Sequence, residues 1–156
     1  MTARIFIDSN IPMYAAGRDH PLKNPSVEIL SRITDHPALF FTSAEVLQEI
    51  FHRYLSLGRL EDGRGILTRF AKLMRGRIEP IHGEDVERAA SLAENYAPAL
   101  SARDLLHAVV MLRTGAERIA SADGDFDIMS AEGIVRLDPM DVEEWGGEIS
   151  SGESGA

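Results

Sequence analysis

The chain has 156 residues, of which 44% are hydrophobic and 26% charged, proportions typical of one globular domain with a sizeable core. It contains no cysteine, which excludes disulfides and thiolate metal sites and fits a reducing compartment such as the cytoplasm. The formal net charge of −9 excludes general binding of polyanions, so a nucleic-acid site would need a local basic patch and bound cations.

Short apolar runs alternate with amphipathic stretches along most of the chain. The apolar runs predict four to five strands, over residues 5–7, 38–41, 77–81, 117–121 and 133–137. The amphipathic stretches predict helices over residues 9–16, 25–34, 43–57, 60–74, 84–96 and 101–113. Two of these helices open on capping-box patterns, Thr42 to Glu45 and Ser101 to Asp104, and Gly58 is expected to end the first of them.

This alternation of strands and helices predicts an α/β fold, with a central parallel sheet of four to five strands flanked by helices on both faces. We expect a single domain over residues 1–140. Residues 141–156 are acidic and then rich in Gly and Ser, which predicts a largely disordered tail. Neither a signal peptide nor an apolar run of the about 20 residues that span a membrane is expected.

Two acids follow predicted strands. Asp8 comes directly after the first strand, and Asp123 follows the fourth strand after the small residue Ser121. Because parallel strands end at the same edge of a sheet, the two carboxylates are expected to be neighbours where ligands bind. The alternative for Asp8 is an ordinary helix N-cap, a position that Asp, Ser and Asn all favour.

A third acid, Asp104, falls on a helix whose nearby positions are apolar. Those neighbours on a helical projection are Leu105, Ala108, Met111 and Leu112. A charge among them would be largely desolvated, which is costly unless the charge is paired or bound to a metal. The alternative is that Asp104 serves only as the capping-box acid of Ser101, although the two roles are compatible.

The helix over residues 43–57 offers two further acids, Glu45 and Glu49, which lie one turn apart on the side away from its apolar positions. Glu45 is expected to complete the capping box of Thr42, which leaves Glu49 as the better site candidate. Periodicity alone does not separate the two, and a solvated helix face is the alternative for both.

Grouped carboxylates without cysteine favour a hard cation that prefers oxygen ligands, Mg²⁺ or Mn²⁺. Such an ion would remove the repulsion between the acids and could activate a water for attack on a phosphodiester. His82 and His107 lack the spacing of zinc ligands. His107, one turn after Asp104, is expected to be a packed or supporting residue.

A local basic segment contrasts with the acidic chain. Residues 53–77 hold seven basic residues against two acidic ones, a local net charge of +5. A basic lobe beside an acidic pocket suits a metal-dependent nuclease, because cations hold the phosphates while acids hold the metal. The candidate RNA-binding residues are Arg53, Arg64, Arg69, Lys72 and Arg75. The alternative is a pair of solvated amphipathic helices.

Four segments in this order resemble PIN-domain proteins, and most closely the VapC-type toxins of toxin–antitoxin systems. They are residues 5–10, 42–50, 100–108 and 119–127, and the resemblance extends over about residues 3–138. It implies a metal-dependent endoribonuclease whose acidic set, both metal-binding and catalytic, is Asp8, Glu49, Asp104 and Asp123. It also favours Glu49 over Glu45, because the family acid precedes an aliphatic residue such as Ile50.

The resemblance carries further expectations. It implies a PIN-like three-layer sandwich, supporting roles for Asn10 and Ser121, and extra acids at Asp125 and Asp127, with Asp127 as a possible cap of the following turn. It also implies an RNA substrate, a small VapB-type antitoxin that blocks the site, and a homodimer. The alternatives are a PIN-like module that binds RNA or protein without cutting, and a structure-specific DNA nuclease.

Overall fold

The computed structural model describes residues 4–153, and the side chains of residues 4–149. Its strands are short, and every paired neighbour runs parallel. Their bounds are β1 Ile5–Ile7, β2 Phe40–Ser43, β3 Ile78–Glu79, β4 Arg118–Ala120 and β5 Val135–Leu137. The five strands form one sheet in the order β3-β2-β1-β4-β5. The α/β class and the parallel sheet predicted from the sequence are therefore confirmed.

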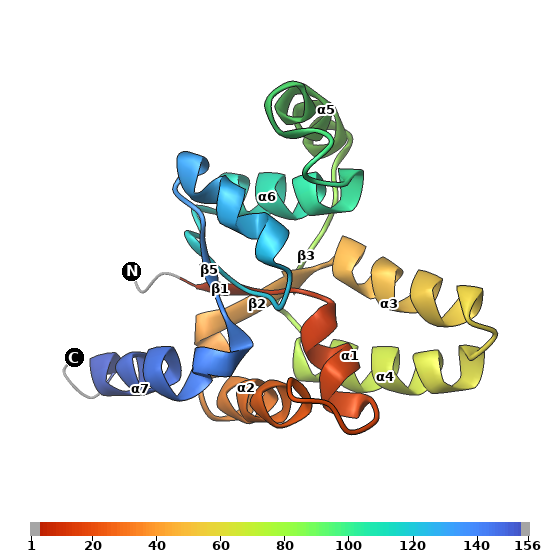
Figure 1. The fold of residues 1–156 in the computed structure, drawn as a ribbon, viewed down its shortest axis with the longest axis vertical. Helices are drawn as coiled ribbons and strands as arrows, with labels where there is room; N and C mark the ends of the chain where they lie inside the picture. Colours follow the sequence, from red (N-terminus) through yellow and green to blue (C-terminus); the bar gives the residue numbers. More distant parts are fainter. Residues whose placement is uncertain (1–3, 154–156) are drawn as a thin grey trace.

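Seven α-helices and three 3₁₀ segments lie between or after the described strands. The α-helices are α1 Asn10–Ala16, α2 Lys23–Asp35, α3 Ala44–Ser56, α4 Leu60–Leu73, α5 Gly83–Tyr96, α6 Ala102–Thr114 and α7 Val142–Glu153. The 3₁₀ segments are η1 Pro37–Leu39, η2 Gly124–Glu132 and η3 Pro139–Asp141. Figure 1 shows α5 and α6 on one side of the sheet and α1, α2, α4 and α7 on the other, which gives three layers.

The strand order reverses between β1 and β4. The chain winds outward from β1 through β2 to β3, then crosses back to β4 and continues to β5. In sheets of this type a crevice opens at the carboxyl ends of the strands where the order reverses. Asp8 and Ser121 occupy those ends, and the amide of Asp8 donates to the carbonyl of Ala120 at 3.1 Å.

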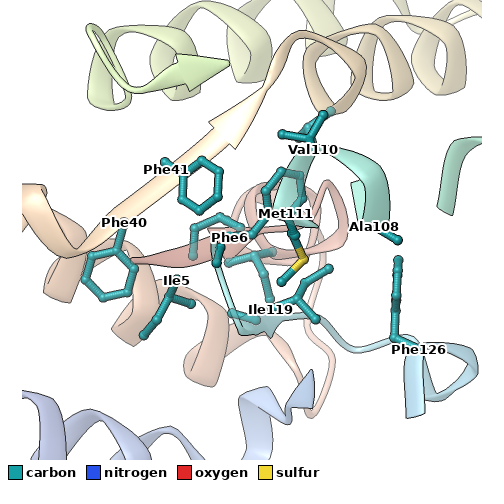
Figure 2. Close-up of a cluster of buried hydrophobic side chains, with 14 of the residues drawn as sticks. Ile5, Phe6, Phe40, Phe41, Ala108, Val110, Met111, Ile119 and Phe126 are labelled. Atoms are coloured by element: carbon teal, nitrogen blue, oxygen red, sulfur yellow. The ribbon is translucent and has the colours of Figure 1, made fainter. Parts of the chain in front are cut away.

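The core forms around β1, whose residues Ile5, Phe6 and Ile7 are all fully buried. A strand buried on both faces needs apolar residues at every position, because helices cover the sheet on each side. Phe6 meets Phe41 of β2 edge to face, with ring centroids 5.3 Å apart. Figure 2 shows side chains from β1, β2, β4, α6 and η2 meeting in one cluster, among them Phe40, Ala108, Val110, Met111, Ile119 and Phe126.

The second strand begins later than predicted, and the helix cap moves with it. Pro37 opens a 3₁₀ turn over residues 37–39, so β2 extends to Ser43 rather than ending at residue 41. The N-cap of α3 is Ser43, whose hydroxyl accepts from the amide of Val46, so the capping box predicted for Thr42 and Glu45 is wrong. The Thr42 hydroxyl instead donates to the carbonyl of Ile7 at 2.9 Å.

The acidic C-terminal segment, expected to be largely disordered, contains helix α7. Val142 and Trp145 are buried, and the Trp145 indole N–H donates to the carbonyl of Asp138 at 2.9 Å. These apolar anchors fix the helix against the domain, which acidic composition alone did not reveal. Residues 154–156 of the predicted tail lie outside the described residues. Within residues 4–153, no helix is both long enough and apolar enough to cross a membrane.

Candidate metal centre

Asp8 is held rigidly at the end of β1. Its side chain accepts hydrogen bonds from the Ser9 amide at 2.7 Å, the Asn10 side-chain amide at 3.1 Å and the Ser121 hydroxyl at 2.7 Å. The residue is only 4% exposed. Three donors on one buried carboxylate fix its orientation and offset part of its desolvation.

Asn10 and Ser121 link Asp8 to the loop after β4. The Asn10 amide nitrogen donates to the Ser121 hydroxyl oxygen, and the Asn10 carbonyl oxygen accepts from the Ala122 amide, both at 3.1 Å. The Ser121 hydroxyl oxygen also accepts from the amide of Asp123 at 3.0 Å. The two residues expected to support the site therefore join the β1 and β4 edges into one network.

Glu49 reaches the same place from the second turn of α3. Its Oε1 lies 2.5 Å from Nε2 of His107, and its Oε2 accepts from the Ser9 hydroxyl at 2.7 Å. His107 is fully buried on α6, and its Nε2 also lies 3.6 Å from Oδ1 of Asp8. Helices α3 and α6 thus bring an acid and an imidazole to the end of β1.

These contacts produce one compact group of ligand atoms. One atom each from Asp8, Glu49 and His107 lie within 4.8 Å of one another, and no other trio of His, Asp or Glu in the described part does so. Asp104 and Asp123 are not members of the group. Glu49 and His107 are thus near neighbours of Asp8, and the expected proximity of Asp8 and Asp123 stays a prediction.

Asp104 lies at the start of α6, where it forms the predicted capping box with Ser101. The Ser101 hydroxyl accepts from the Asp104 amide at 3.2 Å, and the Asp104 carboxylate accepts from the Ser101 amide at 3.3 Å. Asp104 is partly exposed, so its environment is less apolar than its helical projection predicts. Desolvation raises its pKa, and the charge of Asp123 adds to the shift despite the bonds from Ser101 and the charge of His107.

The acids after β4 have separate local roles. Asp123 is the N-cap of η2, and its carboxylate accepts from the Asp125 amide at 2.9 Å. Asp127 pairs with Arg136 at 2.8 Å, which lowers the pKa of that carboxyl. The cap expected at Asp127 is therefore supplied by Asp123, and the Asp125 side chain is exposed.

Burial and charge act differently on the three central groups. Desolvation raises the pKa of Asp8, and the charge of Glu49 raises it further, against the attraction of His107. Desolvation would also raise the pKa of Glu49, but the bonds from His107 and Ser9 and the charges of His107 and Arg103 outweigh it and lower that pKa. Burial opposes the charged form of His107, yet the bond to Glu49 and the charge of Asp8 raise its pKa overall.

The bond to Glu49 assigns the proton on His107. A carboxylate accepts only, so Nε2 of His107 must carry hydrogen while it bonds to Glu49. Its Nδ1 is buried and has no hydrogen-bond partner among the described residues. An imidazole nitrogen that donates to a carboxylate has no lone pair for a metal, so Asp8 and Glu49 supply the free ligands of this group.

The donor set fits a hard divalent cation. Two carboxylates share a buried space, where desolvation raises the pKa of Asp8 and the charge of Glu49 raises it further, so additional positive charge is favoured there. A divalent ion would supply that charge, and oxygen ligands without sulfur favour Mg²⁺ or Mn²⁺. Asp104, whose pKa responds to the charges of His107 and Asp123, lies within electrostatic reach of the same space.

The predicted basic residues lie on different sides of the α3–α4 pair. Arg53 follows Glu49 by one turn on α3 and so shares its stripe. Lys72 and Arg75 instead line an apolar groove of about 780 Å³ together with Phe51. Since helical positions advance by about 100° per residue, Phe51 projects about 160° away from Glu49. Arg64 is exposed on α4, and Arg69 lines a second groove between α1, α2 and α4.

Sequence reasoning missed the hydrogen bonds of Ser9 and of His107. Ser9 is the N-cap of α1, but its hydroxyl makes no capping bond and donates to Glu49 instead. His107 was expected only to pack or to give support, and its direct bond to Glu49 spans 58 residues of sequence. A small hydroxyl beside a strand-end acid, and a histidine one turn after Asp104, were the available signals.

Comparisons with known proteins give one family model and several relatives that match most of the chain. The family model of the PIN domain matches residues 5–132. Ribonuclease VapC23 of Mycobacterium tuberculosis is 40% identical over 119 residues, which cover 76% of this chain and 92% of that protein. The fold is similar to that of Mycobacterium tuberculosis VapC20, a Sarcin-Ricin loop cleaving toxin, with a TM-score of 0.68 at 19% identity over 85% of this chain and 98% of the other. The fold is also similar to that of VapBC2 from Rickettsia felis, bound to a DNA fragment from their promoter, with a TM-score of 0.61 at 15% identity over 86% of this chain and 97% of the other.

Proposed function

Because the chain belongs to the PIN-domain family, we propose that it is a metal-dependent endoribonuclease and the toxin of a type II toxin–antitoxin system. The observation that carries the proposal is the pair of carboxylates, Asp8 and Glu49, gathered at the point where the strand order reverses. Buried acids at a ligand-binding edge are costly unless they serve a cation or a reaction.

Asp8 and Glu49 would hold Mg²⁺ or Mn²⁺, with Asp104 and Asp123 completing the site directly or through water. When bound there, such an ion would supply positive charge to the phosphate and would lower the pKa of an attacking water. We assign the catalytic role to these four acids together. Asp125 is a weaker candidate, and the Asp127 carboxylate already forms a salt bridge with Arg136.

The surrounding residues orient the acids. Ser121 and Asn10 fix one oxygen of Asp8, while Ser9 spans the two acids, its amide bonded to Asp8 and its hydroxyl to Glu49. His107 holds the other oxygen of Glu49. A carboxylate fixed in this way needs no reorganisation when its ligand or substrate arrives.

For the substrate we propose cellular RNA, which places the activity in the cytoplasm. Arg53 is the member of the predicted basic set that shares the stripe of Glu49, and it is the one we favour for phosphate contact at the site. Arg64, Arg69, Lys72 and Arg75 remain proposed contacts for more distant parts of the RNA. The relatives' names as ribonucleases, and the absence of a large inserted segment between the described elements, favour RNA over structured DNA.

The proposed partner is a small VapB-type antitoxin. An acidic site of this kind is blocked by a basic side chain, and the structural likeness to VapBC2 supports a partner of this class. We also propose a homodimer, which light scattering at high concentration would test. Growth arrest on overexpression, relieved by a small neighbouring open reading frame, is the expected genetic result.

The deciding experiment compares cleavage of total cellular RNA by the wild type and by Asp8→Asn in Mg²⁺ or Mn²⁺. Loss of one site carboxylate should reduce the rate by at least about a hundredfold while leaving the fold intact by circular dichroism. Asp19→Asn, at an exposed aspartate in the α1–α2 loop, is the matched control and should cleave normally.

Excess chelator should abolish the wild-type activity. Full cleavage by Asp8→Asn, or in chelator, would overturn the mechanism. Tight RNA binding by the wild type without cleavage in either metal would favour a binding module, and cleavage restricted to structured DNA would favour the DNA nuclease. Mapping the new RNA ends after brief induction would then identify the substrate.

A further inference from the structure

Arg103 lies on the helix face that meets the candidate metal centre. It belongs to the first turn of α6, directly before Asp104, and its side chain is exposed. It precedes His107 by four residues, so the two side chains share one stripe of the helix. Because His107 bonds to Glu49, that stripe faces α3 and the acids.

The opposing stripe on α3 consists of Glu45, Glu49 and Arg53, spaced one turn apart. The positive charge of Arg103 acts on both glutamates of this stripe. Burial raises the pKa of Glu45 and the charge of Arg103 partly opposes that rise, while at Glu49 the same charge adds to the bonds and charge of His107 that lower the pKa. His107 thus lies fully buried at the inner side of the site, and Arg103 lies exposed at its solvent side.

The guanidinium of Arg103 has no hydrogen bond or salt bridge to any residue that the structure describes. Other arginines are committed to the protein: Arg77 donates to three backbone carbonyls, Arg113 pairs with Asp85, and Arg136 pairs with Asp127. An arginine that faces an acidic site and is not held by one carboxylate keeps its donors available for a ligand.

We propose that Arg103 binds a phosphate of the RNA next to the bond that is cut. The proposal deepens the proposed function and rests on it. A polyanion that approaches the four acids is repelled, and a fixed cation at the rim offsets that repulsion where the backbone must enter. The planar fork of arginine also matches the phosphate geometry with two parallel donors.

A purely electrostatic role gives a different result. If Arg103 only neutralised Glu45 and Glu49, its removal would strengthen binding of a divalent cation and leave RNA binding unchanged. If Arg103 binds phosphate, its removal strengthens binding of the divalent cation and weakens binding of RNA. Lysine at this position keeps the charge but loses the fork, so Arg103→Lys separates the two roles.

The test measures RNA binding and cleavage separately. Binding of a short fluorescein-labelled single-stranded RNA is followed by anisotropy in the Asp8→Asn background, with Arg103 unchanged or replaced by Ala or Lys. We expect Arg103→Ala to weaken RNA binding about tenfold. The slope of the logarithm of the binding constant against the logarithm of the salt concentration should fall by about one in magnitude. Arg103→Lys should recover only part of the affinity. Arg88→Ala, at an exposed arginine on α5, makes the same charge change away from the site and should bind normally.

In the cleaving protein, Arg103→Ala should raise KM about tenfold and leave kcat within about twofold. Unchanged RNA affinity in Arg103→Ala, or an equal loss in Arg88→Ala, overturns the proposal. A wild type that binds RNA through Arg103 but never cleaves it refutes the proposed nuclease while supporting the phosphate contact. Cleavage of RNA by Arg103→Ala at the wild-type rate and KM refutes the contact alone.

Discussion

Replacing His107 by Leu tests whether the imidazole holds the two buried carboxylates of the metal-free protein. His107 is fully buried, its Nε2 lies 2.5 Å from Glu49 and 3.6 Å from Asp8, and its ring packs between Phe6 and Phe126. Leucine retains an apolar side chain between those rings. The main loss is therefore the charged hydrogen bond rather than core volume.

The expected cost follows from the partners that remain. Removing one member of a buried ion pair costs about 3–5 kcal/mol, because the other charge is left without compensation. Glu49 keeps the Ser9 hydroxyl and is 14% exposed, and Asp8, whose pKa is already raised, can take a proton. We therefore expect His107→Leu to lower the free energy of unfolding by about 3 kcal/mol, near the lower end of that range.

Urea unfolding monitored by circular dichroism, with and without Mg²⁺, is the assay. His107→Gln retains a neutral donor and should cost only about 1–2 kcal/mol. His52→Ala, at an exposed histidine of α3, is the control and should be nearly neutral. An ion present at 100 times its Kd adds about 2.7 kcal/mol, and without the competing imidazolium the same Mg²⁺ concentration should stabilise His107→Leu more than the wild type.

Two outcomes would refute this reasoning. A metal-free cost for His107→Leu of less than about 1 kcal/mol would mean that the acids do not depend on the imidazole. A response to Mg²⁺ that equals the wild-type response would mean that the ion and the imidazolium do not serve the same charges.

Two further predictions concern parts of the fold away from the acids. Thermal melts of two glycine variants test the packing of α3 against α4. Gly63→Ala should destabilise the protein by about 1–2 kcal/mol, since an added Cβ would lie 2.9 Å from Cγ of Tyr54. Gly65→Ala should stabilise it by about 0.5–1 kcal/mol, because its Cβ meets only the Arg69 side chain. Asp85→Asn should cost about 1–3 kcal/mol at pH 7 through lost capping and a lost charged bond to Arg113. Because the pKa of Asp85 is lowered in the folded state, its stabilising effect is complete above its unfolded pKa of about 3.9 and is lost as the pH falls through the folded value. The free energies of unfolding of the wild type and Asp85→Asn should therefore converge in acid. A difference that stays constant with pH would contradict this account.

The sequence identified features that depend on local chemistry. The run Ile5 to Ile7 predicts a buried strand because every position is apolar, and the capping box of Ser101 and Asp104 forms as the spacing predicts. The strand ending at Ser43 was misplaced because a threonine and a serine in succession both suit an N-cap. The bond of Ser43 to the Val46 amide and the bond of Thr42 to the Ile7 carbonyl decide between them.

The inner arrangement of the site depends on tertiary distances. Periodicity places Glu49 and His107 on their helices, but the angle at which α3 meets α6 determines that the two bond to each other. The same holds for Trp145, whose burial anchors a helix in a segment of unfavourable composition. Composition averages over a segment, whereas one or two buried anchors are enough to order it.

The arrangement of charge explains how a chain of net charge −9 keeps acids buried before any cation binds. Asp8 depends on neutral donors and a raised pKa, so it can exist without a charged partner. Glu49 depends on His107, which holds it ionised. One carboxylate is thus oriented but ready to be protonated, and the other is charged but already paired. As the pH is lowered, protons compete with a divalent ion for the first carboxylate and the imidazolium competes with it for the second, so the affinity for the ion should fall.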